Sequence, residues 1–172
     1  PKMFCFGMDA VLLSAFANVT NEDKVLDMGS GNGVIPLLIQ GRYEPTSITG
    51  LEIQEANVNM SRRSVHLNGI ADKVQIIQGD IKEADILLPL SSFDVVICNP
   101  PYMDAGRGLT NELTAKTIAR HEVLCTLEDV IRSASRLTDV GGKFYLVHRP
   151  HRLVEIIAMM RPPKGARIND LT

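Results

Sequence analysis

Residues 24–36 read Lys-Val-Leu-Asp-Met-Gly-Ser-Gly-Asn-Gly-Val-Ile-Pro. The first five, Lys24–Met28, form a short apolar run that predicts a β-strand. A glycine turn follows, and Val34 begins an apolar segment that predicts a helix. Pro36 suits the first turn of that helix, because the turn can do without one backbone N–H. A strand, a glycine turn and a helix in this order form the first half of a nucleotide-binding βαβ unit.

The spacing of the glycines narrows the class of ligand. The dinucleotide fingerprint G-x-G-x-x-G requires a small residue at its last position. Val34 occupies that position here, because the third glycine, Gly33, comes one residue early. This spacing argues against NAD. No Lys-Ser/Thr pair follows the turn, so a P-loop is excluded as well. Taken alone, the glycines are also compatible with a plain tight turn.

Two further predicted strands lead to an acidic residue. Glu52 follows directly after Ser47–Leu51, and Asp80 follows two residues after a strand predicted over 74–78. A carboxylate at the tip of the second strand is where a nucleoside ribose receives bidentate hydrogen bonds, so Glu52 is the candidate for holding ribose hydroxyls. Singly, such acids are more often solvated loop residues. Together with Asp27, three acids at successive strand ends indicate a ligand at the carboxyl edge of an open α/β sheet.

A fourth predicted strand, Phe93–Cys98, runs directly into Asn99-Pro100-Pro101-Tyr102. Proline restricts the residue before it to extended conformations and lacks an N–H group. Asn99 is therefore held at the strand end, in a segment that offers carbonyl acceptors and few donors. The Asn99 side-chain oxygen and the Pro100 carbonyl can accept both hydrogens of a planar NH2 group, while Tyr102 stacks on the attached ring. The alternative is a strand that simply ends in a proline-rich turn.

Composition and layout predict a single domain over residues 1–172, with a short lead-in at 1–20 and a tail at 161–172. The chain has 172 residues, 45% of them hydrophobic, and a net charge of −2, which allows an ample core. Strands and helices alternate, so we expect an α/β fold with a doubly wound, mainly parallel sheet. The other predicted elements are a helix over 54–68 that ends at Asn68-Gly69, a helix opened by a capping box at Thr126–Asp129, a strand over 142–147 and a helix over 151–160.

We expect no membrane span, no metal site and a cytoplasmic location. No stretch approaches about eighteen consecutive apolar residues, and no signal peptide is visible. Cys5, Cys98 and Cys125 are scattered without C-x-x-C spacing, which is typical of reduced thiols in a cytosolic protein. The chain begins at Pro1 in the middle of a pattern, so we expect it to be a fragment of a longer protein.

The segment over 103–125 has no clear periodicity and is too long for an ordinary connection, which predicts a substrate-facing loop. His121 lies within it and is a conceivable general base. We favour a structural or phosphate-contacting role for His121, because methylation of an amine does not require a strong base.

The tetrapeptide at 99–102, taken with the glycine loop, resembles the class I N-methyltransferases that act on planar amino or amide nitrogens. Three stretches sharpen this resemblance toward the bacterial tRNA(Val) adenine-37 N6-methyltransferase family. They are Phe6-Gly7-Met8-Asp9-Ala10-Val11-Leu12-Leu13, Asp27-Met28-Gly29-Ser30-Gly31-Asn32-Gly33-Val34-Ile35-Pro36-Leu37-Leu38 and Ala119-Arg120-His121-Glu122. The resemblance covers the chain from Phe6 to about Met160.

The resemblance implies a Rossmann-like class I methyltransferase fold, lacking its C-terminal strands in this fragment, and S-adenosylmethionine as cofactor, with S-adenosylhomocysteine as product. It implies that Asp27 helps order the loop and its ligand, and that Asp80 accepts from the adenine amine of the cofactor. The implied catalytic residues are Asn99, Pro100 and Tyr102. The implied cofactor-binding residues are Asp27, Gly29, Ser30, Gly31, Asn32, Gly33, Glu52, Ile53, Asp80, Ile81 and Asn99.

From these features we predict SAM-dependent methylation of the exocyclic amine of an adenine in RNA, most simply in tRNA next to the anticodon. The alternatives are N-methylation of a protein glutamine amide or of another nucleic-acid amine, and a SAM-binding module without catalysis. The net charge of −2 does not favour a nucleic-acid binder, although Arg149 and Arg152 form a local basic cluster. The glutamine enzymes carry a helical domain ahead of the glycine loop, whereas residues 6–17 enter this fold directly, which favours the nucleic-acid branch.

Overall fold

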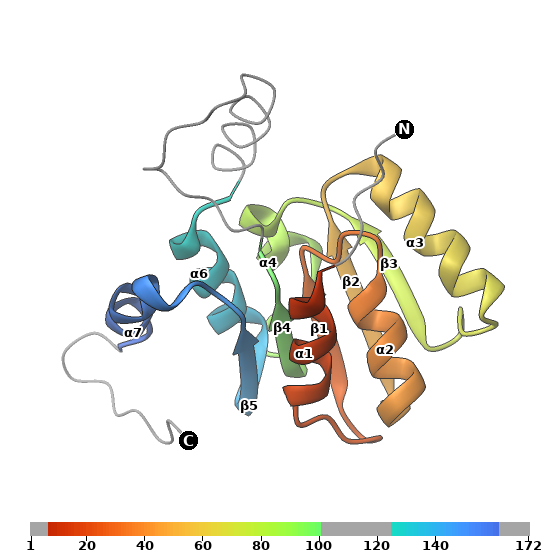
Figure 1. Ribbon diagram of the computed structural model, residues 1–172, viewed down its shortest axis with the longest axis horizontal. Coiled ribbons are helices and arrows are strands. Elements are labelled where there is room, and N and C mark those ends of the chain that lie inside the picture. The colour runs from red at the N-terminus through yellow and green to blue at the C-terminus, as the bar shows by residue number, and fades with distance from the viewer. Residues whose placement is uncertain (1–6, 101–124, 162–172) are drawn as a thin grey trace.

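The computed structural model describes residues 7–100 and 125–161. Within them, five strands form one sheet in the order β3-β2-β1-β4-β5, and every neighbouring pair is parallel (Figure 1). The doubly wound, parallel α/β arrangement expected from the alternating pattern is confirmed. The strands are β1 (Lys24–Met28), β2 (Ser47–Glu52), β3 (Val74–Gln78), β4 (Phe93–Cys98) and β5 (Thr138–Leu146).

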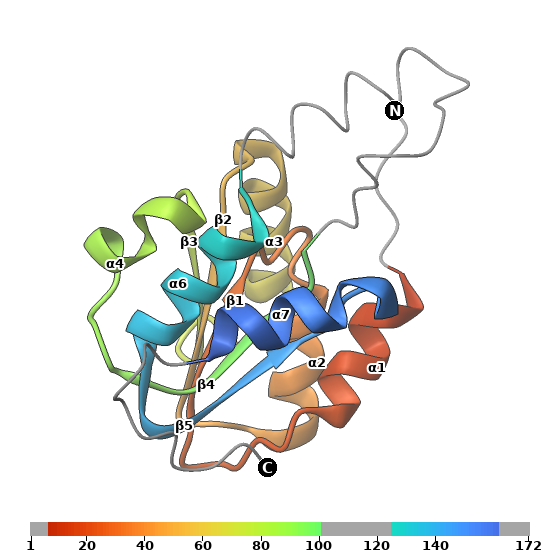
Figure 2. The ribbon, with the colours of Figure 1, turned by 90° about the vertical axis from the view of Figure 1, so that its left-hand side faces the viewer.

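Helices cover both faces of the sheet (Figure 2). One face packs against α1, α2 and α3 through a core that includes Val25 and Ile97, and the other packs against α4 and α6 through a core that includes Leu26 and Val96. Neighbouring strand residues thus point to opposite faces, as the β-pleat requires. The helices are α1 (Met8–Phe16), α2 (Val34–Tyr43), α3 (Glu55–Leu67), α4 (Ala84–Leu87), α6 (Leu127–Leu137) and α7 (Leu153–Met160), and two 3-10 turns are η1 (Ile81–Glu83) and η2 (Pro150–Arg152).

Two predicted helix ends are confirmed in atomic detail. At the end of α3, Gly69 adopts a left-handed φ of 66° and donates its N–H to the His66 carbonyl, while the N–H of Ile70 donates to the Val65 carbonyl. These two bonds form a Schellman motif, which glycine favours. At the start of α6, the Thr126 hydroxyl accepts from the Asp129 N–H, and the Asp129 carboxylate accepts from the Thr126 N–H, as in a capping box.

The fifth strand differs from the prediction of 142–147. Thr138 already pairs with Phe93, and the next pair joins Lys143 to Val95, so residues 139–142 bulge out of the ladder. A Cβ on Gly142 would lie 2.9 Å from the Asp94 carbonyl oxygen, so this bulge requires glycine where it passes β4. The hydrophobic pattern reveals only the regular part of the strand, from Lys143 onward.

Two other elements also depart from the prediction. Pro150 opens a 3-10 turn, so the helix expected from residue 151 begins as α7 at Leu153. α4 is only 4 residues long, too short to show a helical period in the sequence. No helix in the described part of the chain combines the length and apolar character needed to cross a membrane.

Candidate functional site

The carboxyl ends of the parallel strands meet at one edge of the sheet, and the strand register determines which residues are neighbours there. Met28 pairs with Cys98 of β4, so the glycine loop that follows Met28 begins beside Asn99. On its other side the loop begins beside Glu52, the last residue of β2. Asp80 follows two residues after the end of β3. Since paired strands lie about 4.8 Å apart, residues predicted from four separate stretches come together at this edge.

The glycine loop adopts a backbone that other residues would strain. Gly29, Gly31 and Gly33 have φ angles of 74°, 56° and 80°, in the left-handed region that glycine tolerates. A Cβ on Gly33 would also lie 2.9 Å from the side chain of Ser61 in α3. The loop therefore needs glycine both for its conformation and for its contact with α3.

Ser61 is a site residue that the sequence analysis missed. Its side chain is fully buried, and its hydroxyl donates to the Gly31 carbonyl at 3.0 Å. The sequence of α3 did indicate that Ser61 is buried, because it lies between the buried Val58 and Val65 on the apolar face of that helix. A lone polar residue at such a position indicates a specific hydrogen-bond partner.

Four backbone N–H groups of the glycine loop donate to acceptors inside the protein. The N–H groups of Gly29 and Ser30 donate to the Leu51 carbonyl at 2.8 and 2.9 Å, that of Gly31 donates to the Glu52 carboxylate at 2.8 Å, and that of Gly33 donates to the Ser30 carbonyl at 2.9 Å. Loops that bind a pyrophosphate aim such N–H groups at the ligand. This loop is therefore unlike a phosphate cradle, in agreement with the argument from glycine spacing against NAD.

Glu52 lies under the loop and is 5% exposed. One carboxylate oxygen accepts from the Gly31 N–H, and the other accepts from the Gln54 N–H, each at 2.8 Å. The Asn57 amide donates to the second oxygen at 3.5 Å. A carboxylate has about four acceptor positions, so Glu52 fixes the loop and keeps capacity for a ligand hydroxyl. Asn57 is a second neighbour that the sequence analysis did not identify.

Asp27 lies at the core of the site with 1% of its surface exposed. Within the described residues, neither of its carboxylate oxygens has a hydrogen-bond partner. The pKa of Asp27 is raised to about 7, chiefly by burial and further by the charge of Glu52. The nearby Ser30 hydroxyl lowers this pKa in part, although it does not reach hydrogen-bond geometry. The carboxylate that accepts from the loop is thus that of Glu52 rather than that of Asp27. A buried carboxylate without a donor favours a cation nearby.

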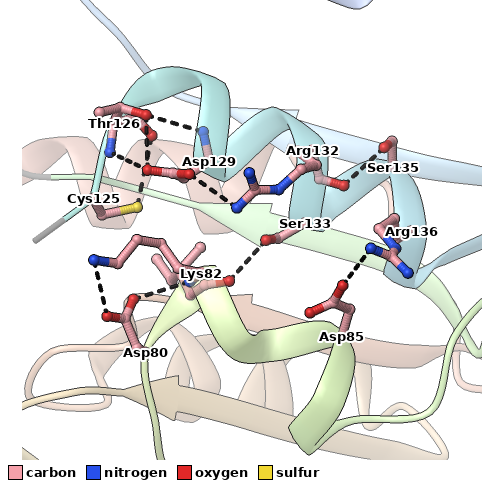
Figure 3. A network of polar contacts seen from close by, with 11 residues as sticks. Asp80, Lys82, Asp85, Cys125, Thr126, Asp129, Arg132, Ser133, Ser135 and Arg136 are labelled. Carbon is pink, nitrogen blue, oxygen red and sulfur yellow. Dashed lines mark hydrogen bonds and ion pairs between the residues drawn. The ribbon is translucent and has the colours of Figure 1, made fainter.

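Asp80 precedes η1, and Ile81 is the first residue of that turn. Figure 3 shows Asp80 beside Lys82. One Asp80 oxygen accepts from the Lys82 N–H at 2.9 Å and so caps η1, and the other lies 3.5 Å from the Lys82 ammonium. The Ile81 side chain lies 3.7 Å from the position of a Cβ on Gly29. Ile53 follows Glu52, and its carbonyl accepts from the Gln78 side-chain amide at 3.4 Å. Of these residues, Ile81 lies against the glycine loop, whereas Asp80 and Ile53 are bonded to Lys82 and Gln78.

Asn99 and Pro100 are half-buried at the end of β4. Pro101, Tyr102 and the segment to residue 124, including His121, lie outside the described residues. Burial raises the pKa of the neighbouring Cys98 well above its usual range, so that thiol stays protonated and is a poor nucleophile. Among the residues that the structure describes, no group of three or more His, Cys, Asp or Glu side chains could hold a metal ion.

Comparison with protein families gives a match over most of the chain. A family model described as the methyltransferase small domain matches residues 7–161. The curated relatives include tRNA1(Val) (adenine(37)-N6)-methyltransferases. The protein of Porphyromonas gingivalis is 29% identical over 156 residues, which cover 87% of this chain and 60% of the relative. The protein of Erwinia tasmaniensis is 32% identical over 142 residues, which cover 82% of this chain and 57% of the relative. The chain thus spans 57–60% of the length of these relatives.

Several solved structures that share the fold are titled as methyltransferases. A predicted O-methyltransferase from Agrobacterium tumefaciens superimposes with a TM-score of 0.65 and 26% identity, over 87% of this chain and 65% of its own. A geranyl diphosphate methyltransferase, determined in complex with SAM, gives a TM-score of 0.60 and 20% identity, over 82% of this chain and 48% of its own. The second likeness concerns the fold alone.

Proposed function

Since this chain belongs to the methyltransferase small domain family, we propose that it methylates the exocyclic amine of an adenine in RNA, with S-adenosylmethionine as methyl donor. The RNA we propose is tRNA, with the target adenine next to the anticodon, because the curated relatives are named for that modification. The observation that carries the proposal is the position of Asn99. It follows Cys98, which pairs with Met28, the residue directly before the glycine loop. A group that accepts from an amine thereby adjoins the cofactor loop.

The electrostatics of the glycine loop support this choice of cofactor. S-adenosylmethionine carries an ammonium and a sulfonium and no phosphate. The N–H groups of Gly29, Ser30, Gly31 and Gly33 donate to the protein itself. The buried carboxylate of Asp27 has no donor among the described residues. Both features suit a cationic ligand better than a phosphate. We assign the ribose hydroxyls to Glu52, and the adenine to Asp80 and Ile81.

The chemical difficulty lies in the target nitrogen, whose lone pair is delocalised into the adenine ring. When bound, S-adenosylmethionine supplies an electrophilic methyl group on a positively charged sulfur. The Asn99 side-chain oxygen and the Pro100 carbonyl accept the two N–H groups, which favours a more tetrahedral nitrogen and stabilises the positive charge that develops on it. Holding the amine in line contributes about 7–11 kcal/mol in well-oriented reactions. We assign to Tyr102 the stacking of the base. The proton then leaves to water.

The experiment that tests this proposal compares Asn99→Ala with a matched control, Asn68→Ala, which lies at the exposed end of α3. Asn99→Ala should bind S-adenosylmethionine within a few-fold of the wild type and lose most turnover, because Asn99 acts on the amine as charge develops. Methyl transfer to unmodified tRNA is measured by mass spectrometry of the nucleosides. Asn68→Ala should leave both quantities unchanged.

A wild-type rate in Asn99→Ala would remove the role assigned to that side chain. A second result would change the substrate only. If the wild type ignores tRNA and methylates a glutamine peptide, the target is an amide nitrogen, and the cofactor and the role of Asn99 stand.

A further inference from the structure

We propose that Ser133, in the middle of α6, is a positioning residue for the adenine end of the cofactor site, an inference that rests on the proposed function. Ser133 is 1% exposed. Its hydroxyl donates to the Ile81 carbonyl at 2.7 Å, across 52 residues of sequence (Figure 3). The bond joins α6 to the turn that carries Asp80 and Ile81.

The bond is unusual for a serine inside a helix. Such hydroxyls commonly donate to a carbonyl three or four residues earlier in their own helix. Ser64 donates to the Met60 carbonyl in this way, and Ser135 donates to the Arg132 carbonyl. Ser133 instead reaches a different segment, so its hydroxyl stabilises a tertiary position rather than its own helix.

Ile81 is the residue through which a shift of the turn would reach the ligand. Its carbonyl accepts from the Ala84 N–H as well as from Ser133, and its side chain lies against Gly29 of the glycine loop. Asp80 precedes it and caps the same turn through the Lys82 N–H. A fixed Ile81 carbonyl therefore fixes the Ile81 side chain against the glycine loop. It also fixes Asp80, the residue assigned to the adenine amine.

A second polar contact of α6, with α4, is more exposed to solvent. Arg136 of α6 pairs with Asp85 of α4, but the Arg136 side chain is 52% exposed, and exposed ion pairs contribute little. Arg136 can thus be changed to loosen α6 against α4 without touching Ile81. Ser135 lies two residues after Ser133 in the same helix and is exposed, which makes it the matched serine control.

The test measures binding of S-adenosylmethionine by calorimetry, together with KM for the same compound and kcat at saturation. Ser133→Ala should weaken binding about tenfold, the size of about one net hydrogen bond, and raise KM in proportion, with kcat within about twofold of the wild type. Ser133→Cys keeps the shape and replaces the hydroxyl by a weak donor, so its affinity should fall between the two. Ser135→Ala and Arg136→Gln should bind as the wild type does, even where Arg136→Gln lowers the melting temperature.

Wild-type affinity in folded Ser133→Ala would overturn the inference and leave the proposed function intact. If Ser133→Ala does not fold, wild-type affinity in Ser133→Cys overturns it equally. Equal weakening by Arg136→Gln would also overturn it, because the effect would then be general loosening of α6. A wild type that binds no S-adenosylmethionine would refute the proposed function itself, and the inference with it.

Discussion

The protonation state of the buried Asp27 should depend on whether a cationic ligand is bound. Its carboxylate has no hydrogen-bond partner among the described residues, and burial raises its pKa to about 7. Near neutral pH the side chain is therefore divided between its two protonation states. A cationic ligand favours the charged state, so binding of such a ligand at this edge of the sheet should release part of a proton.

Asp27 should also make the stability of the free protein depend on pH. Its pKa is near 3.8 when unfolded and about 7 when folded, so between these values the folded state binds more protons. The free energy of unfolding should therefore fall as pH rises from about 4 to about 7, with the penalty complete above that range. Asp27→Asn should abolish this part of the decline, which approaches about 1.4 kcal/mol per pH unit.

Urea unfolding between pH 5 and pH 8 measures this prediction. Asp72→Asn is the control, because Asp72 is exposed, and it should keep the slope of the wild type. The same slope in Asp27→Asn would show that Asp27 does not titrate in this range.

At the scale of elements, the turn between β1 and α2 makes the most specific demand on sequence. Gly33 combines a φ of 80° with a Cβ position 2.9 Å from the Ser61 side chain, whereas Gly41, within α2, has nothing within 4 Å of its Cβ position. Gly33→Ala should lower the free energy of unfolding by about 1–3 kcal/mol, through backbone strain and overpacking. Gly41→Ala should raise it by about 0.5–1 kcal/mol, because alanine suits a helix interior better than glycine does.

Chemical denaturation of the two variants beside the wild type checks this pair. Both changes add one methyl group to a glycine near α2, so opposite signs would isolate the effect of position. A neutral or stabilising Gly33→Ala would mean that the loop tolerates a side chain where the contact with α3 leaves no room.

Local patterns predicted the elements that depend on local forces. The apolar runs gave strands β1, β3 and β4 with the bounds that the structure has, and β2 one residue short, since Glu52 belongs to that strand. Thr126 with Asp129 identified the start of α6. The contacts of Ser61 and Ser133 depend instead on segments 30 and 52 residues away in sequence. No periodicity encodes such partners, although a buried serine on an apolar helix face signals that one exists.

At the scale of the whole molecule, the parallel sheet brings residues from separate stretches of sequence together at one edge. The placement of Glu52 and Asp80 at one edge was predictable, because the ends of parallel strands share an edge in such folds. What could not be predicted is that Glu52, rather than Asp27, accepts the hydrogen bond from the Gly31 N–H of the glycine loop. Which of the two buried carboxylates accepts depends on their positions relative to the Gly31 N–H. Strand register and side-chain packing determine these positions together.

Titration calorimetry with S-adenosylmethionine and, separately, with NAD tests the central claim most directly. The loop spacing and its internally bonded N–H groups predict saturable heat with S-adenosylmethionine and none with NAD. Glu52→Ala should weaken that binding by about 1–3 kcal/mol, through loss of ligand hydrogen bonds and of the bond that holds Gly31. Tight binding of NAD without heat from S-adenosylmethionine would contradict the account.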